Sequence, residues 1–415
     1  SSAASDVYKR QVYMLHYISL VISIYHNIFM NLLGKMKMFD SNNNMFVIIA
    51  IVTLVIGGLV GYIVLGSDTE EKIVEVEKTE EVDNFLYING AGASFPFPLV
   101  SNMIEKYFET HDTVRINYQS IGSGGGVRQH TAKTIHFGMS DSPLKDSQFD
   151  QAPNSLHIPI TIGSVVIPYN LPGVDTGMHL TGELVADIFL GKVTKWNDPV
   201  ITALNPEIDL PDKAIVVVHR SDGSGTSFIF TSWLAEVSAD WNEAVGAGKA
   251  VEWPTGLGAA GNEGVAGVVT SNEYTIGYIE LAYAIQNDVP VAAIQNLEGN
   301  FIMPSLETAS AAAAGAGEGL PAGKDTWSKV EILNSPGVNS YPIVSFSYML
   351  LYQELNVIPD MDMEKAKALL EFTWWAIHEG QELGPALEYV PLPDAAVSIN
   401  EVTLKSITFN GQAVL

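Results

Sequence analysis

The 415-residue sequence contains no cysteine. This absence excludes disulfides, thiolate metal ligands, a cysteine nucleophile and a lipid-modified N-terminal cysteine. Basic residues are scarce, since 21 lysines and arginines stand against 47 aspartates and glutamates, which gives a formal net charge of −26. That balance argues against nucleic-acid binding and against attraction to anionic membrane surfaces. The nine histidines show no HExxH spacing, so we expect no metal site and no cofactor.

Residues 46–66 form an uncharged run of 21 residues that follows Lys35 and Lys37. At ~1.5 Å per residue, a helix of this length spans the ~30 Å core of a bilayer. The run is longer than a usual signal-peptide segment and lacks an A-x-A cleavage site, so we interpret it as an uncleaved transmembrane anchor rather than a removed signal peptide. Lysines before the run and acidic residues after it predict a single-pass cell-membrane protein whose soluble part is extracytoplasmic.

We do not interpret the segments before and after this run as membrane spans. We interpret residues 1–35 as non-native or translated upstream sequence, because the first residues resemble adapter read-through; a second membrane span over 11–34 is the alternative. Residues 67–84 carry eight acidic and two basic residues. Such a charge run is typical of a solvated stalk.

From residue 85 onward, patterns typical of strands alternate with patterns typical of helices. This alternation predicts an α/β fold. The strand-like runs are 85–90, 114–120, 156–170, 214–218 and 341–351, and helical spacing covers 98–110, 227–237 and 361–380. The segment 309–323, rich in alanine and glycine, reads as a helix end that runs into a surface loop.

Three polar turns share one design. The stretches "GAGASFPFP" (90–98), "IGSGGGVRQ" (121–129) and "RSDGSGTS" (220–227) each follow a strand and precede a helix. Each combines a serine with unpaired N–H groups at a helix N-terminus, which is a favourable place for an anion. Local dipoles and one or two cations would have to attract that anion against the net charge of the chain. The simpler interpretation is that Ser94, Ser123 and Ser224 or Thr226 only cap helices.

Six motifs, taken in order, resemble the phosphate-binding proteins of phosphate ABC transporters. They are "GAGASFPFP", "IGSGGGV", "FGMSDSPL" (137–144), "FLGKVTKWNDPVITALNP" (189–206), "RSDGSGTSFIFTSWL" (220–234) and "EWPTGLGAAGNEGVAG" (252–267). The resemblance extends from about residue 87 to at least residue 379. It implies a two-lobe periplasmic-binding-protein-like fold of type II, with lobe I formed by 85–168 and 341–415 and lobe II by 169–340.

The resemblance also implies a set of phosphate-binding residues. Ser94, the Phe95 N–H and Ser123 would come from the first two turns, and Asp141 would accept a hydrogen bond from a protonated phosphate oxygen. The third turn would supply Arg220, Ser224, the Gly225 N–H and Thr226, with Asp222 holding the Arg220 guanidinium by a salt bridge. The family often has threonine in place of Ser94, which keeps a hydroxyl, and serine in place of Gly124, which lies outside the expected contacts.

The function implied is extracytoplasmic binding of inorganic phosphate and its delivery to an ABC permease with ATPase subunits. One alternative is a receptor for another tetrahedral oxyanion such as sulfate, and another is a surface protein that senses phosphate without transport. An enzyme such as a phosphatase would need a metal cluster or an activated nucleophile beside a base. The sequence shows neither pattern, so we expect no catalytic activity.

Overall fold

The computed structural model describes residues 85–315, 319–330 and 332–415. The expected anchor at 46–66, the expected stalk at 67–84 and residues 1–35 lie outside the described residues. Within the described ranges, no helix is both long enough and apolar enough to cross a membrane.

A six-stranded sheet organises what we call the first lobe, with the strand order β10-β4-β13-β3-β1-β2. β1 runs parallel to β2 and β3, whereas β13 runs antiparallel to β3 and β4. All twelve residues of β4 are buried, which agrees with the β-branched run in its sequence because a strand covered on both faces is typically rich in apolar residues. The strands are β1 (Leu86–Gly92), β2 (Val114–Ser120), β3 (Phe137–Ser140), β4 (Ser155–Val166), β10 (Ile279–Glu280) and β13 (Val344–Tyr352).

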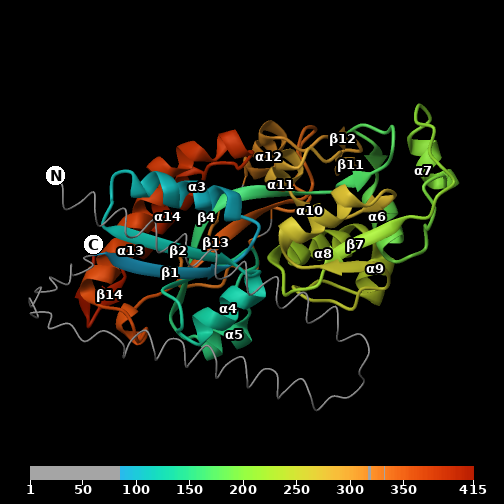
Figure 1. The fold of residues 1–415 in the computed structure, drawn as a ribbon. Helices are drawn as coiled ribbons and strands as arrows, with labels where there is room; N and C mark the ends of the chain where they lie inside the picture. Colours follow the sequence, from blue (N-terminus) through green and yellow to red (C-terminus); the bar gives the residue numbers. More distant parts are fainter. Residues whose placement is uncertain (1–84, 316–318, 331) are drawn as a thin grey trace, which may run out of the picture. The chain divides into compact units, whose positions relative to one another are not determined.

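Helices cover both faces of this sheet (Figure 1). Helix α4 packs against β3 and β1, while α13 packs against β1 and α14 against β4. Helix α13 begins after Asp362, whose side chain accepts a hydrogen bond from the Lys365 N–H, and it ends at Ile377 rather than at Gly380. The elements are α3 (Phe97–Phe108), α4 (Ser123–Thr131), α5 (Asp146–Gln151), α13 (Met363–Ile377), α14 (Asp394–Lys405), the 3₁₀ helices η2 (Leu355–Val357), η3 (Glu379–Leu383) and η4 (Pro385–Leu387), and the hairpin β14 (Thr408–Phe409) with β15 (Gln412–Ala413).

Two smaller sheets organise what we call the second lobe. The four-stranded sheet has the order β5-β9-β7-β8, and the three-stranded sheet has the order β12-β11-β6. The strands are β5 (Tyr169–Asn170), β6 (His179–Leu180), β7 (Val216–Arg220), β8 (Leu257–Ala259), β9 (Thr275–Ile276), β11 (Ala293–Gln295) and β12 (Phe301–Ile302). The helices are α6 (Gly182–Phe189), α7 (Pro199–Leu204), α8 (Gly225–Val237), α9 (Ala239–Ala244), α10 (Gly261–Ser271), α11 (Leu281–Gln286) and α12 (Leu306–Ala313).

The two lobes are joined through the longest strands of the first sheet. β4 ends at Val166, and β5 of the second lobe begins at Tyr169. The short strand β10 pairs with the end of β4, and the chain returns to the first lobe at Val344, where β13 begins and pairs with β4 along its whole length. The predicted architecture of two α/β lobes is therefore confirmed.

Candidate functional site

The turn after β1 is held by three tyrosine hydroxyls. The backbone carbonyls of residues 93–95 accept hydrogen bonds of 2.7 Å from Tyr118, Tyr283 and Tyr389 in turn. Because all three carbonyls are fixed in this way, the orientation of the whole turn is fixed as well. Helix α3 begins after Pro96 without a side-chain cap, so the hydroxyl of Ser94 does not cap this helix.

The hydroxyl of Ser94 instead meets a residue of the second lobe. Asn262, at the start of α10, donates to Ser94 Oγ from its backbone N–H at 3.2 Å and from Nδ2 at 2.9 Å. The same Nδ2 donates to Thr226 Oγ1 at 3.0 Å, and Asn262 Oδ1 accepts from the Glu280 N–H at 2.9 Å. Asn262 is completely buried, and its side-chain amide links the Ser94 turn to the start of α8.

Asp141 lies directly after β3 and is 1% exposed. Its Oδ1 accepts from the Ser347 hydroxyl at 2.7 Å and its Oδ2 accepts from the Ser123 hydroxyl at 3.2 Å. Burial raises the pKa of Asp141 to about 6, and the hydrogen bonds from Ser347 and Ser123 and the charge of Arg220 oppose that rise. The site thus contains a buried carboxyl group that gains its proton close to the physiological range.

Arg220 ends strand β7 and is 3% exposed. Its Nε donates to Asp222 Oδ1 at 2.8 Å and its Nη2 donates to Asp222 Oδ2 at 2.6 Å, which is the pairing expected from the sequence. Its Nη1 lies 3.4 Å from Thr226 Oγ1, and the Gly261 N–H donates to Asp222 at 3.1 Å. Burial favours the neutral form of Asp222, but the bonds and charge of Arg220 outweigh it and lower the pKa of this carboxyl. The bidentate pair holds the guanidinium plane in one orientation.

Helix α8 begins directly after the third turn. Ser224 is its cap, because its Oγ accepts from the Ser227 N–H at 3.0 Å. The N–H groups of Gly225 and Thr226 stand in the first turn of α8, where a helix offers no internal acceptor and its dipole favours negative charge. Helix α4 differs, since Gly122 precedes it with a φ of 77° and Ser123 is its first residue. The capping interpretation thus applies to Ser224 and to neither Ser94 nor Ser123.

The start of α8 lies against the Asp141 carboxylate. A Cβ atom at Gly225 would lie 2.4 Å from both Asp141 Oδ2 and Ser123 Oγ. Nearby, the Gly124 N–H donates to the Gly223 carbonyl at 2.7 Å. Glycine at 225 thus permits an approach that any side chain would prevent.

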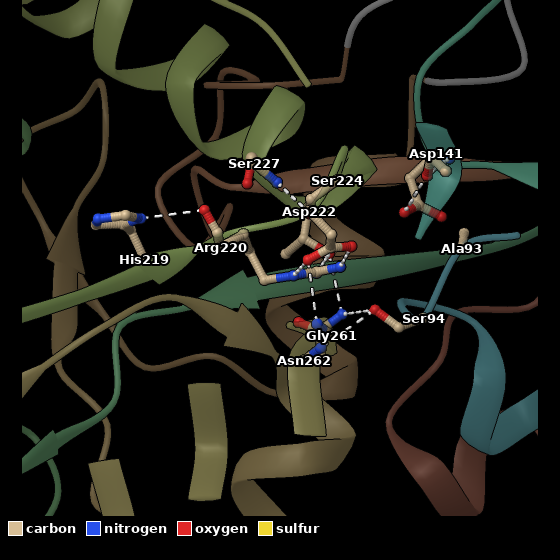
Figure 2. A network of polar contacts seen from close by, with 12 residues as sticks. Ala93, Ser94, Asp141, His219, Arg220, Asp222, Ser224, Ser227, Gly261 and Asn262 are labelled. Atoms are coloured by element: carbon tan, nitrogen blue, oxygen red, sulfur yellow. Dashed lines mark hydrogen bonds and ion pairs between the residues drawn. The ribbon is translucent and has the colours of Figure 1, made fainter. Parts of the chain in front are cut away.

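The structure therefore brings the residues named from the three turns into one polar network. Figure 2 shows Ser94 and Asn262 beside the Arg220–Asp222 pair, with Asp141 near the start of α8. Ser94, Phe95, Ser123, Asp141, Arg220, Ser224 and Thr226 are each at most 3% exposed. His219 points away from the Asp141 carboxylate in Figure 2; its Nδ1 lies 3.1 Å from the Arg220 carbonyl, and its ring stacks on Trp253.

Residues 74–374 match the family model of the PBP superfamily domain. The phosphate-binding protein PstS of Pasteurella multocida is 47% identical over 311 residues, which cover 75% of this chain and 87% of that protein. The phosphate-binding protein PstS of Methanocaldococcus jannaschii is 39% identical over 343 residues, which cover 78% and 87% of the two chains. The chain belongs to the PstS family.

Solved structures agree with this PstS assignment at the level of the fold. A phosphate-binding protein from Stenotrophomonas maltophilia superposes with a TM-score of 0.58 at 20% identity, over 77% of this chain and 94% of that one. A high-affinity periplasmic phosphate-binding protein bound with phosphate gives a TM-score of 0.59 at 19% identity, over 78% and 99% of the two chains. At such identities the likeness concerns the two-lobe fold alone.

Two central residues of this PstS chain were not singled out from the sequence. Asn262 lies in the motif "EWPTGLGAAGNEGVAG", so its position was noticed but its role was not. Ser347 lies in strand β13, where the register with β4 shifts between Ser347 and Tyr348. Such an irregularity can redirect a side chain, and only the paired strands reveal it.

Proposed function

We propose that this protein is an extracytoplasmic receptor for inorganic phosphate that delivers its ligand to an ABC permease and its ATPase subunits. The observation that carries the proposal is that the site offers several hydrogen-bond donors but one buried carboxylate as acceptor. Ser94 Oγ and Thr226 Oγ1 accept from Asn262, and Ser224 Oγ accepts from Ser227. A hydroxyl that already accepts still has its own hydrogen to donate, so these three hydroxyls remain available as donors, while Asp141 is a buried acceptor.

This pattern fits phosphate better than a fully ionised oxyanion. The unprotonated phosphate oxygens accept from the three hydroxyls, the Phe95 and Gly225 N–H groups and Arg220. A protonated phosphate oxygen donates to Asp141, which as an ionised carboxylate can only accept. Ser123, which the resemblance places among the phosphate-binding residues, also orients Asp141, because its hydroxyl donates to Asp141 Oδ2 and accepts from the Asp141 N–H at 3.1 Å. Asp222 orients Arg220 through two hydrogen bonds. The PstS relatives, whose names state phosphate binding, support the same ligand.

Titration calorimetry of the full chain with phosphate, arsenate and sulfate tests this function. We expect saturable heat with phosphate at neutral pH and much weaker binding of sulfate, because sulfate brings no proton to Asp141. Absence of phosphate binding, or equal binding of sulfate, contradicts the proposal. A phosphatase assay on the same sample distinguishes the receptor from an enzyme of phosphate release.

We further propose that the receptor is tethered to the cell membrane by one helix at 46–66, with 67–84 as an acidic stalk and 1–35 as non-native sequence. Lobe I of the type II fold then comprises 85–168 and 341–415, and lobe II comprises 169–340. The uncharged run and the missing cleavage site support the tether, and the two connections at β4 and β13 support the lobes.

The tether predicts how the native protein fractionates. Because an uncleaved span remains buried in lipid, we expect the protein to stay with the membrane after washing with salt and to be released only by detergent. N-terminal sequencing of the extracted protein should start before residue 46. Release without detergent, with a chain that starts near residue 67, would show that the anchor is removed.

The pKa of Asp141 predicts a pH-dependent selectivity. A carboxyl whose pKa is raised to about 6 is ionised at pH 7.5 and mostly protonated at pH 5. The protonated group can donate to sulfate, so we expect the phosphate-to-sulfate affinity ratio to fall by about tenfold from pH 7.5 to pH 5. Competition titrations at both pH values measure the ratio. A ratio that does not change between them would mean that Asp141 does not titrate in this range or does not face the anion.

A further inference from the structure

Lys249 is fixed beside the N-terminus of α8. Its backbone carbonyl accepts from the Ser224 N–H at 2.8 Å. The preceding residue, Gly248, donates from its N–H to Thr231 Oγ1 at 3.0 Å. Lys249 is therefore attached to the cap of the helix that presents the Gly225 and Thr226 N–H groups.

The ammonium group of Lys249 is buried without a partner. Among the described residues its Nζ has no hydrogen-bond partner and almost no exposed surface. Burial and, to a smaller extent, the charge of Lys145 lower the pKa of Lys249 to about 8, although the charge of Asp141 acts in the opposite direction. Lys249 belongs to the second lobe, yet the charged and titratable groups that it acts on, Asp141, Lys145 and His157, all belong to the first. Its charge thus acts across the junction of the lobes.

The other charged groups of the site do not balance one another, so a second cation has a role there. Arg220 is paired with Asp222 through two hydrogen bonds, and an ionised Asp141 adds a second negative charge. Without Lys249 these three groups carry a net negative charge before any anion enters. A buried charge that stays unpaired is costly, so an anion bound beside Lys249 Nζ would remove that cost.

We propose that Lys249 is a further phosphate-binding residue, which supplies the second cation of the site and takes the bound phosphate as its missing partner. The proposal rests on the proposed phosphate site. Without the anion, closing the lobes buries an unpaired ammonium that faces Lys145 and is countered by Asp141 alone. With the anion bound, the same closure completes an ion pair. Lys249 therefore makes closure depend on the ligand.

Substitution Lys249→Met in the full chain tests this role. We expect phosphate affinity, measured by calorimetry at pH 7.5, to fall at least about tenfold. The melting temperature of the phosphate-free protein should stay level or rise, because an unpaired buried charge is removed, while the increase on adding phosphate should shrink. Lys249→Arg should restore much of the affinity. Lys195→Met removes an exposed lysine paired with Asp212 and should behave as wild type.

The pH dependence of the wild-type protein gives an independent test. Above pH 8, Lys249 of the phosphate-free protein loses its proton, so phosphate affinity should fall by about tenfold between pH 7 and pH 9.5. An affinity that stays constant over that range overturns the proposal even if the Met variant fails to fold. Normal affinity in Lys249→Met overturns it too and leaves the receptor function intact. A Lys249→Arg protein that is as stable as wild type but does not regain phosphate affinity overturns the proposal as well. If wild-type protein binds no phosphate, the function itself is wrong.

Discussion

Arg220→Ala is expected to weaken phosphate binding by at least about tenfold, which corresponds to ~1.4 kcal/mol. Charge-assisted hydrogen bonds contribute roughly 1.5–3 kcal/mol each, and Arg220 is 3% exposed, so water does not screen it well. The substitution also leaves Asp222 as an unpaired carboxylate near the anion, which adds repulsion. Titration calorimetry of the folded variant at neutral pH measures the loss.

Two further variants separate these contributions. If stranded Asp222 repels the anion, the double variant Arg220→Ala/Asp222→Ala should bind phosphate more tightly than Arg220→Ala alone. Arg128→Ala removes an exposed arginine from α4 and should leave the affinity unchanged. Wild-type affinity in a folded Arg220→Ala protein would remove Arg220 from the site.

Asp141→Asn is expected to reduce the phosphate-to-sulfate affinity ratio by at least about tenfold, or ~1.4 kcal/mol. The ionised carboxylate accepts from protonated phosphate but meets only lone pairs on sulfate. A site built around one hydrogen bond rejects an analogue that lacks it by ~10⁴–10⁵ in other proteins. The amide of asparagine can offer an N–H to sulfate instead, so the repulsion that rejects sulfate disappears.

Competition at neutral pH between phosphate and sulfate measures this ratio in the variant. Asp146→Asn, which removes an exposed carboxylate from α5 of the same lobe, serves as the matched control and should keep the wild-type ratio. The pH-dependent loss of selectivity expected for wild type should also disappear in Asp141→Asn, because the titrating group is gone. An unchanged ratio would mean that another group discriminates between the anions.

Much of the fold follows from local patterns in the sequence. The run at 114–120 predicts β2 with its observed bounds. The β-branched run at 156–170 predicts one strand, which the structure divides into β4, ending at Val166, and β5, beginning at Tyr169. The strand expected at 214–218 lies instead at Val216–Arg220, so Arg220 is the last strand residue rather than part of the turn. Helix α13 ends at Ile377, before the predicted end at Gly380, because the chain continues as the 3₁₀ helix Glu379–Leu383, which contains Gly380.

The candidate site was only partly predictable, for a physical reason. Serine and glycine turns before helices are visible in the sequence, but hydrogen bonds between distant residues are not. Ser347 reaches Asp141 across 206 positions and Asn262 reaches Ser94 across 168. The first contact depends on strand register within the first sheet, and the second depends on the approach of the two lobes. The same holds for Lys249, because Asp141 and Lys145, the charged groups that act on its ammonium, belong to the opposite lobe.

A crystal structure of the protein grown with phosphate at neutral pH tests the central claim most directly. The account predicts one phosphate ion enclosed between the lobes, with its oxygens at hydrogen-bond distance from the Arg220 guanidinium, the Thr226 hydroxyl and the Asp141 carboxylate. Phosphate bound elsewhere, or a closed protein whose Arg220 and Asp141 contact no anion at saturating phosphate, would contradict it.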